Sequence, residues 1–174
     1  MQSVYELARN IQLLIFDVDG VLTDGSLYLG DDGQEYKAFN SLDGHGIKML
    51  RKSGVEIAII TGRTSNVVVH RAKNLGIPHL YQGVEDKLTA FQHLTEALNI
   101  RHEACAFMGD DVVDLPAMRR CGLALTVPRA PALVRQHAHY VTQYEGGKGA
   151  AREICELIMQ AQGTFNTQMA AYLA

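Results

Sequence analysis

Short apolar runs alternate along the chain with longer segments in which apolar residues recur every three or four positions. The runs are "LLIFD", "VEIAIIT", "ACAFMGD" and "LALTV", with a shorter one near "HLYQG". Each has the length and composition of a buried strand. The longer segments predict helices at residues 43–53, 65–75, 88–98, 115–120, from about 131, and 150–162. Strands that alternate with amphipathic helices form βαβ units. The expected fold class is therefore α/β, with a doubly wound, mainly parallel sheet.

The stretch between the first two buried strands has a different pattern. "LYL" and "EYKAF" flank the turn sequence "GDDG", which predicts a β-hairpin within a flap at residues 25–40. The hairpin carries apolar side chains, namely Leu27, Tyr28, Leu29, Tyr36 and Phe39. A lone two-stranded hairpin is marginal in water, so we expect hairpins of several subunits to pack together and roof each other's sites.

Composition indicates one globular domain. The chain has 174 residues, 47% hydrophobic and 20% charged, with no linker-like segment. We expect a single domain over residues 1–174, with a C-terminal tail at 163–174. A net charge of −3 without a basic block argues against nucleic-acid or membrane partners, and no run suits a signal peptide or a transmembrane span. The odd, scattered cysteines, Cys105, Cys121 and Cys155, predict reduced thiols in a cytoplasmic protein.

Polar residues gather where the predicted strands end. Asp17-Val18-Asp19-Gly20 ends the first strand, Thr61 ends the second, and Asp110-Asp111 follows the third. Ligands of parallel sheets bind at these carboxyl ends, so the residues should converge on one crevice. The full cluster is Asp17, Asp19, Thr61, Lys87, Asp110, Asp111 and Asp114. Its five carboxylates need a counter-charge, and Mg²⁺ is the natural one because no His/Cys spacing suits zinc.

Mg²⁺ beside a lysine suits a phosphoryl group, whose oxygens must be neutralised in the transition state. An aspartate held there can attack phosphorus and form an aspartyl-phosphate, which water then cleaves. A second carboxylate two residues on can protonate the leaving oxygen and later deprotonate the water. The cluster therefore predicts a phosphatase.

Four motifs in order, "DVDGVLTDG", "TGR", Lys87 and "GDDVVD", resemble the haloacid dehalogenase superfamily of phosphatases. "DGHGIKML", "GDDVVDLPAM" and "GGKGAAREI" extend the resemblance over nearly the whole chain. They are similar to the branch that hydrolyses 3-deoxy-D-manno-octulosonate 8-phosphate in lipopolysaccharide biosynthesis. The resemblance implies a Rossmann-like fold, a Mg²⁺ cofactor, a sugar-acid phosphate substrate and a homotetramer. Most relatives with this chemistry carry a cap domain, but the intervals 20–54 and 62–86 leave no room for one.

The resemblance also implies a role for each site residue. Asp17 would be the nucleophile and a metal ligand, and Asp19 the general acid/base that binds Mg²⁺ through its backbone carbonyl. Thr61 and Lys87 would hold the phosphoryl group, Asp110 would be the third metal ligand, and Asp111 and Asp114 would orient Lys87 or the metal's waters. The implied substrate contacts are Asp19, Asn40, Ser41, Leu42, Asp43, Gly44, Lys48, Gly62, Arg63, Arg71 and Lys87. The resemblance further suggests that the tail after Gly163 reaches a neighbouring site.

Simpler and rival interpretations remain for some features. Lys48 and Arg71 also fit ordinary cations on a helix surface, and "GGKGA", which lacks the Walker spacing, predicts a flexible turn before the last helix. A receiver domain uses similar residues, but its acid pair precedes a separate acceptor Asp, an order that this chain does not have. A non-catalytic binding relative and a phosphatase of a nine-carbon sugar-acid 9-phosphate remain as alternatives.

Overall fold

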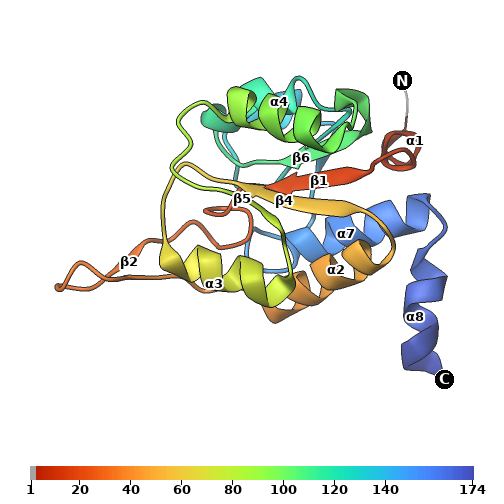
Figure 1. Cartoon of the computed structure of the whole chain (residues 1–174), viewed down its shortest axis with the longest axis horizontal. Helices are drawn as coiled ribbons and strands as arrows, with labels where there is room; N and C mark the ends of the chain where they lie inside the picture. Colours follow the sequence, from red (N-terminus) through yellow and green to blue (C-terminus); the bar gives the residue numbers. More distant parts are fainter. Residues whose placement is uncertain (1–2) are drawn as a thin grey trace.

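The computed structural model describes residues 3–174, and a six-stranded, wholly parallel sheet forms its centre (Figure 1). The strands are β1 (Leu13–Phe16), β4 (Glu56–Ile60), β5 (His79–Tyr81), β6 (Cys105–Met108), β7 (Leu123–Thr126) and β8 (Tyr140–Val141). Their order is β5-β4-β1-β6-β7-β8, with β1 paired on both sides. Strands β1, β6 and β7 are buried along their whole length, as expected for a sheet covered on two faces.

Helices cover both faces of the sheet, which confirms the doubly wound fold. Figure 1 shows α4 on one face and α2, α3 and α7 on the other. The helices are α1 (Val4–Ala8), α2 (Ser41–Lys52), α3 (Asn66–Leu75), α4 (Lys87–Leu98), α5 (Leu115–Met118), α6 (Ala132–His137), α7 (Ala150–Ala161) and α8 (Phe165–Leu173). Short 3₁₀ turns span His102–Ala104 and Val112–Asp114. Within residues 3–174, no helix is long and apolar enough to cross a bilayer.

Polar side chains decide where the helices around the site begin. Asn40 caps α2 by accepting hydrogen bonds from the backbone N–H groups of Leu42 and Asp43, so this helix begins two residues before the predicted start. Asp86 caps α4 in the same way, which places Lys87 at the first helical position. These caps fix the ends of α2 and α4 near the carboxyl edge of the sheet.

Three short elements were absent from the sequence prediction. They are α1, the two-residue strand β8, and α8, which occupies the segment predicted only as a tail. No residue of α8 is fully buried, although Phe165 and Met169 pack against the core and the Tyr172 ring meets His45 edge-on at 5.6 Å. Helix α8 carries too few buried side chains for its sequence pattern to stand out.

The hairpin forms as predicted and projects from the body of the molecule (Figure 1). Strand β2 (Tyr28–Leu29) pairs antiparallel with β3 (Glu35–Tyr36), and the side chains of Leu27, Tyr28, Leu29 and Tyr36 are exposed. Phe39 differs from the prediction because it packs against the main core, with the Arg71 guanidinium 5.4 Å from its ring centroid. The apolar surface of the hairpin therefore ends at Tyr36.

Candidate active site

The predicted polar residues meet in one cleft at the carboxyl ends of the central strands. Asp17 follows β1, Thr61 follows β4, Asp110 lies just beyond β6, and Lys87 opens α4. The cleft has a volume of about 560 Å³. It is lined by Asp17, Asp19, Gly25, Thr61, Gly62, Arg63, Val84, Glu85, Lys87, Asp110, Asp111 and Val113.

A buried lysine joins two of the carboxylates. The Lys87 ammonium lies 2.8 Å from Asp17 Oδ2 and donates a hydrogen bond of 2.6 Å to Asp114 Oδ1. Burial alone would lower the lysine's pKa, but the two carboxylates outweigh it and the pKa is raised. Lys87 is therefore held as a cation that faces Asp17.

Asp114 is fully buried and orients its neighbours. Besides the bond from Lys87, its Oδ2 accepts hydrogen bonds from the backbone N–H groups of Asp110 (3.0 Å) and Asp111 (3.1 Å). Both of its oxygens are thus occupied by protein donors. Asp111 is exposed and caps the 3₁₀ turn that carries Asp114. Asp114 thus contacts Lys87 directly, whereas the Asp111 carboxylate bonds within its own turn, and the supporting roles that the resemblance implies for the two residues stay predictions.

The remaining carboxylates fit a hard divalent cation. Oxygens of Asp17, Asp110 and Asp114 lie within 4.8 Å of one another, the one such metal-sized group among residues 3–174. Burial, with the nearby acids, raises the pKa of Asp110 to about 7, and burial and Asp114 raise that of Asp17 to about 6 despite Lys87. Burial is the larger cause of both shifts and the neighbouring carboxylates the smaller one, and a bound cation would offset both. Since Asp114 is already engaged, Asp17 and Asp110 are the side chains available to hold Mg²⁺.

Glycines allow the loops of the site to approach closely. Gly20 has φ +83°, and a Cβ there would lie 2.0 Å from Asp110 Oδ2. A Cβ on Gly146 would lie 1.9 Å from the Gly20 carbonyl oxygen, and the Gly147 N–H donates to the Val21 carbonyl. The "GGKGA" segment is therefore a turn before α7, as predicted, and its tight packing against the catalytic loop was not predicted.

Two charged residues of the hairpin reach the site without having been predicted there. The Lys37 ammonium lies 2.5 Å from Asp19 Oδ1 and 3.2 Å from Glu35 Oε1. Arg63 Nη2 lies 2.8 Å from the same Glu35 oxygen. The available signal was a pair of opposite charges, two residues apart, in an otherwise apolar hairpin strand.

Only some of the predicted sugar-contact residues line the cleft. Gly62 and Arg63 line the cleft, whereas Asn40, Ser41, Leu42, Asp43, Gly44, Lys48 and Arg71 are not among its lining residues. Buried Asp43 accepts hydrogen bonds from the backbone N–H groups of Gly149 and Arg152, so it caps α7. Arg71 donates to the Asn40 carbonyl, and a Cβ on Gly44 would lie 2.4 Å from its guanidinium.

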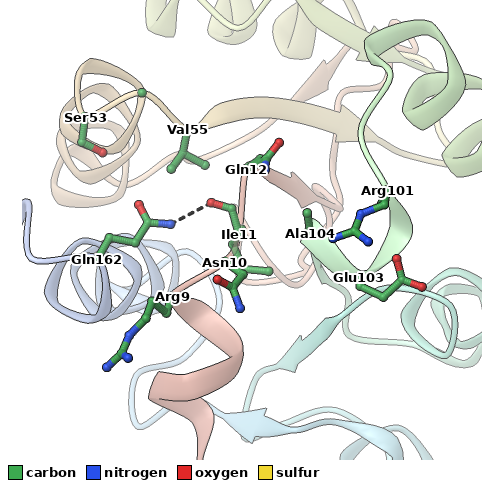
Figure 2. Close-up of a pocket in the computed structure, with 11 residues that line it drawn as sticks. Arg9, Asn10, Ile11, Gln12, Ser53, Val55, Arg101, Glu103, Ala104 and Gln162 are labelled. Atoms are coloured by element: carbon green, nitrogen blue, oxygen red, sulfur yellow. Dashed lines mark hydrogen bonds between the residues drawn. The ribbon is translucent and has the colours of Figure 1, made fainter.

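A separate hollow lies at the opposite end of the sheet (Figure 2). It has a volume of about 490 Å³ and is formed by the segments that precede β1, β4 and β6, including Arg9, Gln12, Arg101 and Glu103. Figure 2 shows Gln162 donating a hydrogen bond to the Ile11 carbonyl across it, at 2.7 Å. This hollow has no cluster of acids like that of the cleft, and its place at the amino ends of the strands is not where α/β sheets bind ligands.

Known proteins share this architecture and much of the sequence. The profile of the haloacid dehalogenase-like hydrolases matches residues 28–122, more than half of the chain. This chain belongs to that family. The matched part includes Thr61, Lys87 and Asp110 and begins after Asp17 and Asp19. Individual relatives match a longer stretch of the chain.

Those relatives cover nearly all of this hydrolase. The 3-deoxy-D-manno-octulosonate 8-phosphate phosphatase KdsC of Yersinia pestis is 50% identical over 160 residues, covering 92% of this chain and 86% of that protein. The protein of the same name from Escherichia coli K12 is 51% identical over 161 residues, with the same coverage. The crystal structure of the Moraxella catarrhalis phosphatase, in complex with magnesium, phosphate and KDO, is 46% identical, with a TM-score of 0.95 and 97% of each chain covered. A probable YrbI family phosphatase from Pseudomonas syringae reaches 52% identity and a TM-score of 0.98, covering 100% of this chain and 99% of that one.

Proposed function

We propose that this hydrolase is a Mg²⁺-dependent phosphatase that releases phosphate from 3-deoxy-D-manno-octulosonate 8-phosphate. The observation that carries the proposal is the placement of the Asp17 carboxylate between the Lys87 ammonium and Asp110, at the floor of an open cleft. About 50% identity to KdsC proteins over 92% of the chain supports the substrate.

The protein groups divide the reaction between them. An Asp17 oxygen attacks phosphorus, an aspartyl-phosphate bond forms, and the bond from phosphorus to the sugar oxygen breaks. Asp19 gives its proton to that sugar oxygen and later removes one from the water that attacks the aspartyl-phosphate and releases Asp17. Lys87 and Thr61 hold the phosphoryl oxygens, and bound Mg²⁺, held by Asp17, Asp110 and the Asp19 carbonyl, supplies positive charge as negative charge develops.

We assign the sugar end of the substrate to the residues around Arg63. Arg63 and Gly62 line the cleft beside Thr61, and a guanidinium suits a carboxylate. The segment 40–44, with Lys48 and Arg71, would contact the sugar acid together with Arg63. Of these, Asp43 and Gly44 would act by shaping the segment, because Asp43 caps α7 and Gly44 makes room for Arg71.

The proposal extends to the setting of the enzyme. We infer a single-domain protein that acts in lipopolysaccharide biosynthesis in the cytoplasm, without nucleic-acid or membrane partners. The three cysteines are free and buried, and burial raises the pKa of each thiol, which suits a reducing compartment. The exposed apolar side chains of the hairpin support a homotetramer in which hairpins pack against one another.

Phosphate release from a panel of sugar phosphates tests the proposal. The eight-carbon sugar-acid 8-phosphate should be preferred over the nine-carbon 9-phosphate and over hexose phosphates, and EDTA should silence the enzyme until Mg²⁺ is restored. Asp17→Asn should abolish turnover, and Asp19→Asn should reduce it by about 10²-fold or more. Preference for simple hexose phosphates contradicts the substrate, and near-normal turnover of Asp17→Asn contradicts the mechanism.

A further inference from the structure

We propose that Lys37, carried by the hairpin, is a positioning residue that holds the carboxylate of Asp19 in the orientation needed for proton transfer. This inference rests on the role of Asp19 in the proposed function and adds a residue that the motifs do not contain. Its basis is the contact between Lys37 Nζ and Asp19 Oδ1 at 2.5 Å.

The environment of Lys37 leaves its ammonium few other positions. The Lys37 side chain is only 1% exposed, and a buried charge is tolerated only where opposite charges pair with it. Asp19 and Glu35 provide those charges on either side. The ammonium is therefore fixed between the catalytic loop and the hairpin.

The ion pair uses one oxygen of Asp19 and leaves the other one for chemistry. Oδ1 is bound to Lys37, whereas Arg63 Nε lies 3.9 Å from Oδ2, beyond hydrogen-bond distance. The Asp19 side chain remains 20% exposed and lines the cleft. Lys37 thus holds one end of the carboxylate so that Oδ2 can exchange a proton with the leaving oxygen.

Glu35 joins this pair to the opposite wall of the cleft. Glu35 Oε1 pairs with both Lys37 Nζ and Arg63 Nη2, and Arg63 directly follows Gly62 just beyond β4. Tyr36, which lies between Glu35 and Lys37 in the chain, is exposed, whereas the Lys37 and Glu35 side chains are only 1% and 14% exposed and contact the charged residues of the site. The hairpin charge cluster, defined as Asp19, Glu35, Lys37 and Arg63, therefore ties the flap to both loops of the site.

A positioned acid matters most when the leaving group is poor. A sugar alkoxide must be protonated as it departs, whereas p-nitrophenolate is stable enough to leave without a proton. Loss of Lys37 should therefore slow formation of the aspartyl-phosphate from an alkyl phosphate and spare its formation from an aryl phosphate. The later hydrolysis of the aspartyl-phosphate also uses Asp19 and is common to both substrates, so the comparison is made on kcat/KM, which reports the first step. A residue needed only for folding or for phosphate binding would affect both substrates alike.

The test compares Lys37→Met and Lys37→Arg with Lys73→Met, which removes an exposed cation from α3. For each, kcat and KM are measured in Mg²⁺ with p-nitrophenyl phosphate and with the best alkyl phosphate of the panel. Lys37→Met should lose about 10-fold to 100-fold in kcat/KM on the alkyl substrate and less than about threefold in kcat/KM on the aryl one. Lys37→Arg should recover part of the loss, and Lys73→Met should match the parent enzyme.

Equal losses in kcat/KM on both substrates, or no loss in kcat/KM on the alkyl substrate, would overturn the proposal. If Lys37→Met fails to fold, as judged by circular dichroism, Glu35→Gln applies the same test, because it removes the second anchor of the lysine and should give a smaller loss of the same kind. The alkyl phosphate in this test is whichever member of the panel the parent enzyme hydrolyses best. A preference for another sugar phosphate would therefore refute the proposed substrate, and the role of Lys37 would still be tested with the substrate that the enzyme prefers.

Discussion

Replacement of Asp110 by asparagine should stabilise the metal-free protein at neutral and higher pH. Buried among Asp17, Asp114 and Asp111, the Asp110 carboxyl has a pKa raised from 3.8 to about 7. A raised carboxyl pKa means that the folded state holds its proton more tightly than the unfolded chain. The folded protein therefore loses stability as pH rises from about 4 to about 7. Below that range both states are protonated, and asparagine imitates the neutral acid.

The size of the effect follows from the shift. A change of about three units corresponds to at most about 4 kcal/mol, at 1.36 kcal/mol per unit. The carboxyl is only partly buried, so solvent screening reduces the expected gain to about 2 kcal/mol. For a chain of this size that is roughly 4–8 °C in Tm.

Thermal unfolding in EDTA at pH 5 and pH 8 measures the gain. Asp110→Asn should unfold at a higher temperature than the parent at pH 8, and the difference at pH 5 should be less than about half as large. Mg²⁺ should raise the Tm of the parent protein and affect the variant much less, because a ligand stabilises only the state that binds it. Asp31→Asn, at an exposed position of the hairpin turn, serves as the control.

A variant that is no more stable than the parent at pH 8 would refute the raised pKa of Asp110. The same conclusion would follow if the gain were equal at both pH values, since a pH-independent gain would come from packing.

Two further predictions concern the loop and the hairpin. Gly20→Ala should lower the free energy of unfolding by about 1–2 kcal/mol because residue 20 has a left-handed backbone conformation, and the added Cβ should displace the Asp110 carboxylate. The displacement should abolish the rise in Tm that Mg²⁺ causes, and an undiminished rise would contradict it. The double variant Leu29→Ser and Tyr36→Ser should have a smaller mass by light scattering, because it removes exposed apolar surface from the hairpin, and its far-UV circular dichroism spectrum should be unchanged. An unaltered mass would assign assembly to another surface.

The core and the acidic cluster could be predicted because their signals are local. Apolar runs identify the central strands, and the residues that directly follow each run are those at the carboxyl end of the sheet. Asp17 and Asp110 could therefore be predicted from the sequence, and the structure places them together. Gly76, with φ +68°, ends α3 where the sequence predicted.

The hairpin charge cluster and the role of Asp43 could not be predicted because their partners are distant in the chain. Lys37 is buried only through contacts with Asp19 and Glu35, and a lysine in an exposed hairpin normally suggests a solvated charge. Asp43 appears in a motif of the sugar-contact segment, yet its carboxylate caps a helix more than a hundred residues later in the chain. Such partners depend on the tertiary fold.

The contact of Gly146 and Gly147 with the catalytic loop has a consequence for synthesis on the ribosome. The loop that carries Asp17 and Asp19 emerges early, but the backbone that packs against Gly20 and Val21 emerges only when most of the chain has been translated. Strand β1 likewise gains its two neighbours, β4 and β6, only later. A nascent chain therefore cannot complete its catalytic loop until it has been translated past Gly147, more than a hundred residues after Asp19.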